Sequence, residues 1–307
     1  MGKYILVIGC STIDESFYER GIRSKISPGG KGNNQAIALA KAGSKVVFLT
    51  KLSGMKEDKL LTNLILKNIK KNKINKKFIE FDKNHHNDYT RIEVSSDGDN
   101  KLIESSDISK TFNKTFVSKH KELIKNASFV IIQLKVPDVV TKEIFRLCKM
   151  FNVKTVLTPC RPQKARKNWR FIEEATHITC NKKEFYEVFA ESNQNKYDED
   201  FLNKTLKKYP NKLIVTLGEK GVKWFDGKRV CFEKAIKAER VIDTTGAGDT
   251  FCGNMVSCLN EGESLRNAIR KGICASTLKI QVAGTQEGMP KKKERDALYS
   301  KVYSKES

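Results

Sequence analysis

Short continuous apolar runs alternate with segments of helical periodicity along most of this 307-residue chain, and that alternation limits its fold more than any other feature. An apolar run without polar alternation suits a parallel strand that is buried on both faces of a sheet. Such runs occupy residues 4–8, 46–49, 129–134, 155–157, 177–179 and 213–217. The helical segments occupy residues 33–42, 58–71, 117–125, 138–150, 199–208 and about 250–281, the last broken near Gly262. Strands that alternate with helices predict an α/β protein whose mostly parallel sheet is covered by helices on both faces.

Two regions depart from this pattern, because their polar and apolar residues alternate. They span about residues 14–28 and 78–105, and the second contains the turn sequence Asp-Gly-Asp-Asn at 97–100. Alternation on both sides of a turn is typical of a hairpin that has one solvated face. We therefore predict one domain over residues 1–307, with a small β-flap, or lid, formed by these two inserted segments.

The net charge of the chain is strongly positive, with 58 Lys and Arg against 36 Asp and Glu, a formal +22. Such an excess suggests a polyanionic partner, so a non-catalytic nucleic-acid-binding protein is the alternative from another functional class. The densest basic run, residues 67–77, has six lysines but no aromatic residue that could stack on bases. Lysines also stabilise the C-terminus of a helix through its dipole. We expect a solvated helix end there, with no specific nucleic acid and no membrane as partners.

The sequence shows neither a membrane span nor a metal-binding cysteine pattern. No uncharged apolar stretch approaches the roughly 20 residues that a membrane-spanning helix needs. The eight cysteines include no Cys-x-x-Cys pair. We therefore expect reduced thiols and a cytoplasmic protein.

The strongest chemical signal in the chain is the segment 243–251, Asp-Thr-Thr-Gly-Ala-Gly-Asp-Thr-Phe, which leads into a predicted helix. Small residues allow successive backbone N–H groups to converge, and the positive end of a helix dipole strengthens the resulting anion site. A carboxylate beside such a site suits a general base that accepts the proton of an attacking hydroxyl. We assign that role to Asp249. The structural alternative is a glycine C-cap followed by an Asp N-cap.

A second glycine-rich segment, residues 28–36, is Pro-Gly-Gly-Lys-Gly-Asn-Asn-Gln-Ala and also leads into a predicted helix. Its lysine is not followed by Ser or Thr and its glycines have the wrong spacing, which excludes a P-loop. The turn after the first predicted strand lacks the three glycines of a dinucleotide-binding fingerprint. Closely spaced glycines beside Lys31 and Asn34 favour hydrogen bonds to a polyhydroxyl ligand.

The two motifs occur in this order and about 210 residues apart. This pattern resembles the ribokinase family of sugar and nucleoside kinases (PfkB-type carbohydrate kinases). The resemblance covers roughly residues 3–298. Four further features support the resemblance. Asp14 follows the first strand as the family's substrate-binding acid does, and Asn181-Lys-Lys-Glu184 matches its Asn-x-x-Glu element. Residues 216–221 and 283–286 resemble its nucleotide-binding loop and its late closing turn. The resemblance implies a ribokinase-like three-layer α/β/α sandwich.

The same resemblance implies a phosphotransferase that acts on an alcohol group, with D-ribose and ATP giving D-ribose 5-phosphate and ADP. Asp249 would be the general base, and backbone N–H groups would stabilise the transferred phosphoryl group from Gly246, Ala247 and Gly248. The residues implied to hold the sugar are Asp14, Gly30, Lys31, Asn34 and Asp249. Those implied to hold ATP are Asn181, Thr216, Gly218, Gly221 and Gly248.

Two cations follow from the same resemblance. Mg²⁺ would bind with ATP, held through water by Glu184 near Asn181. The ligands implied for K⁺, as an activating monovalent cation, are Asp243, Thr245, Ile280, Ala283 and Gly284. The flap would close over the sugar and exclude water, and its exposed face suggests a homodimer.

Two departures from the family pattern fall at positions expected near the acceptor. Thr12 stands where family members commonly carry Asn, and Lys135 replaces an acid in the segment Gln-Leu-Lys-Val-Pro at 133–137. Exchange of an acid for a base changes both the charge and the hydrogen-bonding role of a side chain. The alternative within the family is therefore another sugar kinase or a nucleoside kinase.

Overall fold

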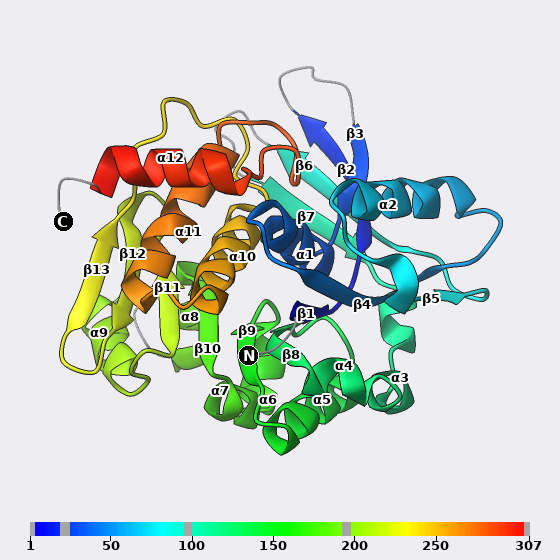
Figure 1. Ribbon diagram of the computed structural model, residues 1–307, viewed down its shortest axis with the longest axis horizontal. Coiled ribbons are helices and arrows are strands. Elements are labelled where there is room, and N and C mark those ends of the chain that lie inside the picture. Colours follow the sequence, from blue (N-terminus) through cyan, green and yellow to red (C-terminus); the bar gives the residue numbers. More distant parts are fainter. Residues whose placement is uncertain (1–3, 19–24, 95–99, 192–197, 304–307) are drawn as a thin grey trace.

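A nine-stranded sheet forms the centre of the molecule (Figure 1). The structure is a computed structural model that describes residues 4–18, 25–94, 100–191 and 198–303. In spatial order the strands are β13 (Val230–Lys234), β12 (Gly221–Phe225), β11 (Leu213–Thr216), β10 (His177–Asn181), β9 (Lys154–Thr158), β8 (Ala127–Gln133), β1 (Tyr4–Ile8), β4 (Val46–Ser53) and β5 (Ile79–Asp82). Neighbours pair in parallel from β5 to β11, whereas β12 and β13 are antiparallel. The predicted mostly parallel sheet is confirmed.

Helices cover both faces of this sheet and complete the predicted three layers. One face packs against α1 (Lys31–Lys41), α2 (Lys59–Lys71), α10 (Ala247–Asn260) and α11 (Leu265–Lys279). The other packs against α3 (Lys114–Ser118), α4 (Lys121–Lys125), α5 (Asp138–Met150), α6 (Pro162–Lys167), α7 (Arg170–Glu174), α8 (Lys182–Phe189) and α9 (Glu199–Lys207). The last helix, α12 (Lys292–Tyr303), packs on α11 (Figure 1). Short 3₁₀ turns span Lys76–Phe78, Ile108–Thr111 and Gly218–Lys220.

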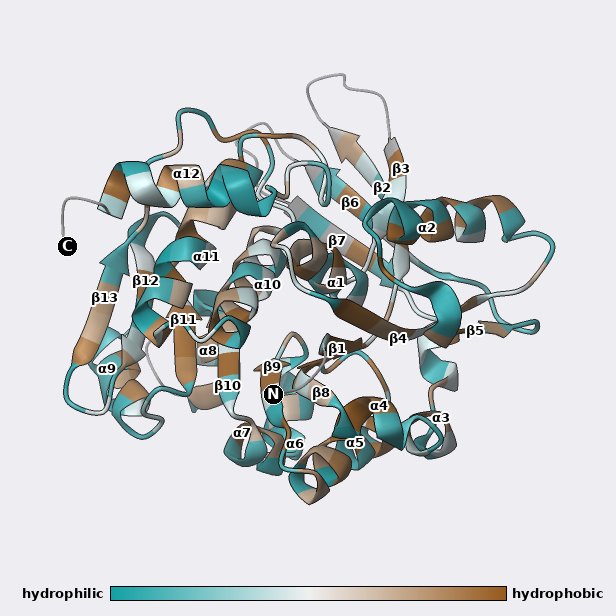
Figure 2. Ribbon diagram, in the orientation of Figure 1, coloured by the Kyte–Doolittle hydropathy of each residue, from teal (hydrophilic) through white to brown (hydrophobic). Residues whose placement is uncertain are grey.

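The burial of the strands explains their unbroken apolar runs. Residues 5–8 of β1 have no exposed surface, and every residue of β4 is buried. Figure 2 shows β4 as strongly hydrophobic, whereas the surface helix α12 is mostly hydrophilic. A strand between two layers of helices has no solvent-facing side on which polar residues would be favoured.

The long helix predicted near the C-terminus is two helices, α10 and α11, with the break at Gly262 as expected. Gly262 has a φ of +88°, a left-handed conformation that favours glycine. The segment predicted as one helix at 117–125 is instead divided between α3 and α4.

A second, four-stranded sheet lies beside the large one and has the order β3 (Lys25–Gly29), β2 (Thr12–Tyr18), β6 (Asp88–Val94) and β7 (Asn100–Ser105) (Figure 1). Most of the predicted turn at 97–100 lies outside the described residues. The second flap segment is predicted to begin at residue 78 and so includes β5, but β5 pairs with β4 in the large sheet. The second segment of the small sheet begins only at Asp88. An edge strand with one solvated face alternates as a hairpin does, which explains the difference.

The six lysines of the basic run 67–77 are all exposed, while Ile69 and Ile74 of the same run are buried. The run therefore has the solvated arrangement expected for a helix end. Among the described helices, none is long and apolar enough to cross a membrane.

Candidate active site

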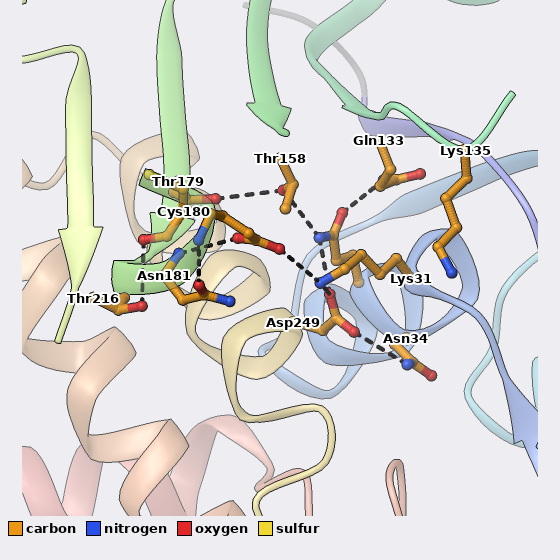
Figure 3. Close-up of polar contacts among 12 residues, drawn as sticks. Lys31, Asn34, Gln133, Lys135, Thr158, Thr179, Cys180, Asn181, Thr216 and Asp249 are labelled. Atoms are coloured by element: carbon orange, nitrogen blue, oxygen red, sulfur yellow. Dashed lines mark hydrogen bonds and ion pairs between the residues drawn. The ribbon is translucent and has the colours of Figure 1, made fainter. Parts of the chain in front are cut away.

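Asp249 lies in the first turn of α10 and is 4% exposed. Its Oδ2 accepts a hydrogen bond from Asn34 Nδ2 at 3.1 Å, and its Oδ1 accepts one from Gln35 Nε2 at 3.0 Å (Figure 3). Both donors belong to α1, so the two glycine-rich motifs meet at this carboxylate. The structure thus brings together the proposed general base and Asn34, which the sequence predicts as a sugar ligand.

Two further glutamines orient the amides that hold Asp249. Gln133 Nε2 donates to Gln35 Oε1 at 2.6 Å, and Gln286 Nε2 donates to Asn34 Oδ1 at 2.7 Å. An amide whose oxygen is already engaged must present its NH₂ group in the opposite direction. Sequence reasoning assigned no role to Gln35, Gln133 or Gln286, although each stands within a segment that carried the family resemblance.

Lys31, the first residue of α1, lies between two carboxylates. Its Nζ is 3.9 Å from Asp249 Oδ1 and 3.9 Å from Glu184 Oε1 (Figure 3). Desolvation lowers the pKa of Lys31, but the carboxylates of Asp249 and Glu184 outweigh it, so the pKa is raised. The Lys31 ammonium therefore lies beside both the proposed general base and Glu184. Its predicted contact with sugar hydroxyls stays a prediction.

Glu184 and Asn181 form the N-terminal cap of α8. Asn181 Oδ1 accepts from Glu184 N at 2.8 Å, and Glu184 Oε2 accepts from Asn181 N at 3.0 Å, which is a capping box. The reciprocal bonds leave Glu184 Oε1 directed toward Lys31. Mg²⁺ in kinases commonly takes one or two carboxylates with water and phosphate oxygens, and Glu184 fits that donor set. Among the described residues, no cluster of three metal-binding side chains offers an all-protein site.

The loop predicted to hold nucleotide begins where β11 ends. Asn181 and Thr216 are paired neighbours at the ends of β10 and β11. Gly218 and Gly221 have φ values of +62° and +130°, and a Cβ at Gly221 would lie 2.0 Å from Glu233 O. The turn therefore needs glycine at Gly221, and it brings Thr216 close to Asn181.

On the opposite side of Asp249, Asp14 projects from β2 and is 5% exposed. A Cβ at Gly29 would lie 1.8 Å from Asp14 Oδ2, so the carboxylate rests directly on the glycine turn before α1. Thr12 Oγ1 donates to Asp14 Oδ1 at 2.5 Å. Burial raises the pKa of Asp14 to about 6, with Asp249 and Glu104 adding to the rise, while Thr12 and Lys135 oppose it.

Glu104 of β7 joins the same site through the register of the small sheet. Asp14 pairs with Thr90, and Thr90 pairs with Glu104, so the three side chains share one face. Glu104 forms ion pairs with Lys135 and Arg161. A pocket is lined by Thr12, Thr90, Glu104, Ser109, Lys135 and Arg161, among other residues. No sequence signal pointed to Glu104, because strand pairing alone places it there.

The loop before α10 has the geometry of an anion site. Gly246 is the N-cap of α10 with a φ of +80°, and a Cβ there would lie 2.8 Å from Thr285 Cγ2. The amide of Ala247 already donates to Thr244 O at 3.1 Å, which engages one of the three N–H groups predicted for the phosphoryl group. Gly248 lies in open space, where an added Cβ would meet no atom within 4 Å.

Asp243 anchors this loop to the turn after α11. Its Oδ1 accepts from Thr245 N and its Oδ2 from Gly284 N, both at 2.8 Å. Lys279 is fully buried beside it and donates from Nζ to Asp243 O at 2.6 Å. Burial lowers the pKa of Lys279 to about 8, while the Asp243 and Glu287 carboxylates oppose the shift. At pH 7 the ammonium form therefore predominates.

Comparison with known proteins agrees with this geometry. The sequence profile described as pfkB family carbohydrate kinase matches residues 3–292. Ribokinase of Bacillus subtilis is 30% identical over 275 residues, 89% of this chain and 88% of that protein. Ribokinase of Lactococcus lactis is 34% identical over 264 residues, 86% of this chain and 83% of that protein.

Among solved structures, Arabidopsis thaliana ribokinase complexed with ribose and ATP superposes with a TM-score of 0.81 at 22% identity, covering 97% of this chain and 99% of that one. This likeness confirms the predicted fold. The profile and the curated relatives go further, because they match at the level of sequence over nearly the whole chain. The chain therefore belongs to the pfkB family of carbohydrate kinases, which are phosphotransferases that act on a sugar hydroxyl.

Proposed function

We propose that this chain transfers the γ-phosphoryl group of ATP to the primary hydroxyl of a sugar, with D-ribose as the first acceptor to test. One observation carries the proposal: Lys31 lies between the carboxylates of Asp249 and Glu184, and Asp249 also accepts a hydrogen bond from Asn34 of the glycine-rich segment 28–36. A general base in that position contacts both reacting groups. The ribokinases of B. subtilis and L. lactis supply the choice of ribose.

The reaction follows from the positions of these groups. Asp249 accepts the proton of the sugar hydroxyl while that oxygen forms a bond to the γ-phosphorus. The bond from the γ-phosphorus to the bridging oxygen breaks, and ADP leaves with the electron pair. The dipole of α10 and the N–H of Gly248 stabilise the transferring group, and Lys31 adds a positive charge.

Magnesium bound with ATP supplies charge neutralisation of the phosphates. Glu184 would hold it through water, with Asn181 fixing the Glu184 carboxylate by the capping box. Thr216, Gly218 and Gly221 would contact the nucleotide beyond the phosphates.

The change at Lys135 leaves an acid in the acceptor pocket. Lys135 lines the pocket as the sequence suggests, but its ammonium is paired with Glu104 from the small sheet. The acid missing at position 135 is thus present at position 104. This pairing favours a neutral polyhydroxyl acceptor, with another sugar or a nucleoside as the alternative.

An acceptor panel tests the function. ADP release is measured with ATP, Mg²⁺ and, in turn, D-ribose, 2-deoxyribose, fructose 6-phosphate, adenosine and inosine. We expect the highest kcat/KM with ribose. A higher kcat/KM with a nucleoside than with ribose would favour a nucleoside kinase. No turnover with any acceptor would contradict the kinase proposal. Nucleic-acid binding that persists at physiological salt in an inactive protein would instead favour the other class.

Acceptor binding should weaken in acid because an ionised Asp14 accepts hydrogen bonds from sugar hydroxyls more strongly than the protonated carboxyl does. Its pKa of about 6 is above the ordinary value, so protonation begins on descending through pH 6. We expect KM for ribose to rise by up to ~10-fold per pH unit below that value. The Asp14→Asn variant should have a high KM for ribose that no longer varies with pH. A wild-type KM that stays constant down to about pH 5 would exclude this role.

Glu104→Gln should raise KM for the acceptor more than it lowers kcat. The substitution removes the charge that Lys135 and Arg161 share, so two cations then face the acceptor alone. We expect KM to rise by about tenfold. Glu15→Gln is the matched control, because Glu15 lies on the opposite face of the same small sheet. Equal effects of the two variants on KM would argue against a specific role of Glu104.

Two further expectations concern the whole molecule. The outer face of the small sheet exposes Ile26 and Ile103, each 49% exposed and aligned through Glu15 and Arg91. We propose this face as the contact between two copies of the chain, and sedimentation velocity would measure whether the protein is a dimer.

All eight cysteines are free thiols, which supports a reducing compartment such as the cytoplasm.

A further inference from the structure

Two of the five residues implied to bind potassium, Asp243 and Ile280, already have their oxygens engaged by backbone N–H groups. Both carboxylate oxygens of Asp243 accept backbone N–H groups, from Thr245 and Gly284. The carbonyl of Ile280 accepts from Ile242 N at 2.8 Å and from Asp243 N at 3.2 Å. Potassium is held where several oxygens together replace its hydration shell. An oxygen cage that includes Asp243 and Ile280 would have to break these bonds, so the two residues as they stand do not fit potassium.

A cation of the chain itself lies at this place. Lys279 is the last residue of α11 and has no exposed surface. Its Nζ is 2.6 Å from Asp243 O and 3.8 Å from Asp243 Oδ1. A buried ammonium is costly unless it is paired and hydrogen-bonded, and here it has both a carboxylate and a carbonyl as partners. The C-terminal end of the α11 dipole favours a positive charge at the same position.

The lysine connects directly to the loop that receives the phosphoryl group. Asp243 begins that loop, and Gly246 ends it in a conformation that glycine favours. Ser276, one turn before Lys279, donates to Ala247 O at 3.1 Å. The end of α11 therefore holds the loop at both ends, through Lys279 and through Ser276.

We infer that Lys279 takes the place of a monovalent metal cation, so that its ammonium neutralises Asp243 and orders the loop 243–246 without potassium. Lys279 is a positioning residue, because it acts on the loop and not on the reacting atoms. The inference rests on the proposed kinase activity, and it predicts that this activity does not depend on the monovalent cation.

The wild-type protein tests this without any substitution. Turnover is measured at constant ionic strength in potassium, sodium and N-methyl-D-glucamine chloride. We expect equal kcat values, whereas an increase of about tenfold in potassium, within the usual range of effector coupling, would overturn the inference. Absence of turnover in every salt would contradict the kinase proposal instead. Thermal melting still decides the role of Lys279, because a melting temperature raised by potassium over sodium would show that the ion binds the folded state.

The Lys279→Ala variant gives the converse result. Removal of the ammonium leaves Asp243 unneutralised and opens a space beside it, so we expect turnover to fall in all salts but to be partly restored by potassium. Lys41→Ala is the matched control: Lys41 donates to the carbonyls of Gln286 and Met289 in the same late turn. That variant should lose stability without gaining a response to potassium. Equal losses for Lys279→Ala in the three salts would indicate a merely structural lysine and overturn the inference.

Discussion

Asp249→Asn should lower kcat by at least ~100-fold, the usual contribution of a positioned general base. The amide cannot accept the proton of the attacking hydroxyl, and its NH₂ group would face the donor amide of Asn34 or of Gln35. ATP should still bind with nearly unchanged affinity, because Glu184, Asn181 and the turn after β11 are unaltered. Pre-steady-state ADP formation and ATP affinity, measured on the same preparation, separate the chemical step from binding.

The control for that experiment is Asp58→Asn, which removes a buried carboxylate that bonds to His86 and Asn87 and not to the residues that hold Asp249. Asp58 accepts from Asn87 N at 2.6 Å at the start of α2, so its loss should reduce the melting temperature but not the rate of the chemical step. If Asp249→Asn retained near-normal kcat, Asp249 would have no part in proton transfer. A loss of kcat matched by Asp58→Asn would point to general destabilisation.

Lys31→Met should lower kcat/KM by about 10² to 10³-fold, the range found when one electrostatic contact to a developing charge is lost. The ammonium lies 3.9 Å from both Asp249 and Glu184, and its removal leaves two carboxylates facing the phosphates without a cation between them. The apolar part of the side chain is preserved in Met, so packing at the start of α1 changes little. We expect the loss to appear for every acceptor in the panel.

Lys41→Met is the matched control, since Lys41 ends the helix that Lys31 begins. Its amine contacts the late turn and not the two carboxylates, so kcat/KM should change far less. If Lys31→Met raised only KM for the sugar and left KM for ATP and kcat unaltered, Lys31 would be a sugar ligand as the sequence suggests. A decrease in kcat supports contact with the transferring phosphoryl group.

The sequence predicted local features well and contacts between distant segments poorly. Unbroken apolar runs identified the six parallel strands β1, β4, β8, β9, β10 and β11, because a strand buried on both faces has no polar side, but they did not identify β12 and β13. Asp249 was identified from its neighbours, because a small-residue loop before a helix makes an anion site by backbone geometry alone. The edge strand β5 was assigned to the flap, because a half-solvated strand of either sheet has the same alternation.

The amides that hold Asp249 show why such contacts could not be predicted. Gln35 and Asp249 are 214 positions apart, and their hydrogen bond exists only because α1 and α10 pack on the same face of the sheet. The pairing of Glu104 with Lys135 likewise depends on which face of β7 turns toward β8. A charge exchange read at one position alone suggests an altered substrate, whereas the structure pairs Lys135 with an acid from another strand.

The sequence by itself predicted the α/β architecture, a candidate general base and the glycines of the two loops, because periodicity, helix starts and left-handed turns are properties of short segments. Only the tertiary structure decided that Lys31 lies between Asp249 and Glu184, that Glu104 lines a pocket with Lys135, and that Lys279 lies beside Asp243. Each of these depends on side chains from different helices and strands meeting at the carboxyl edge of the sheet. A buried charge is stable only where packing brings its partner, and no pattern along the chain records that partner.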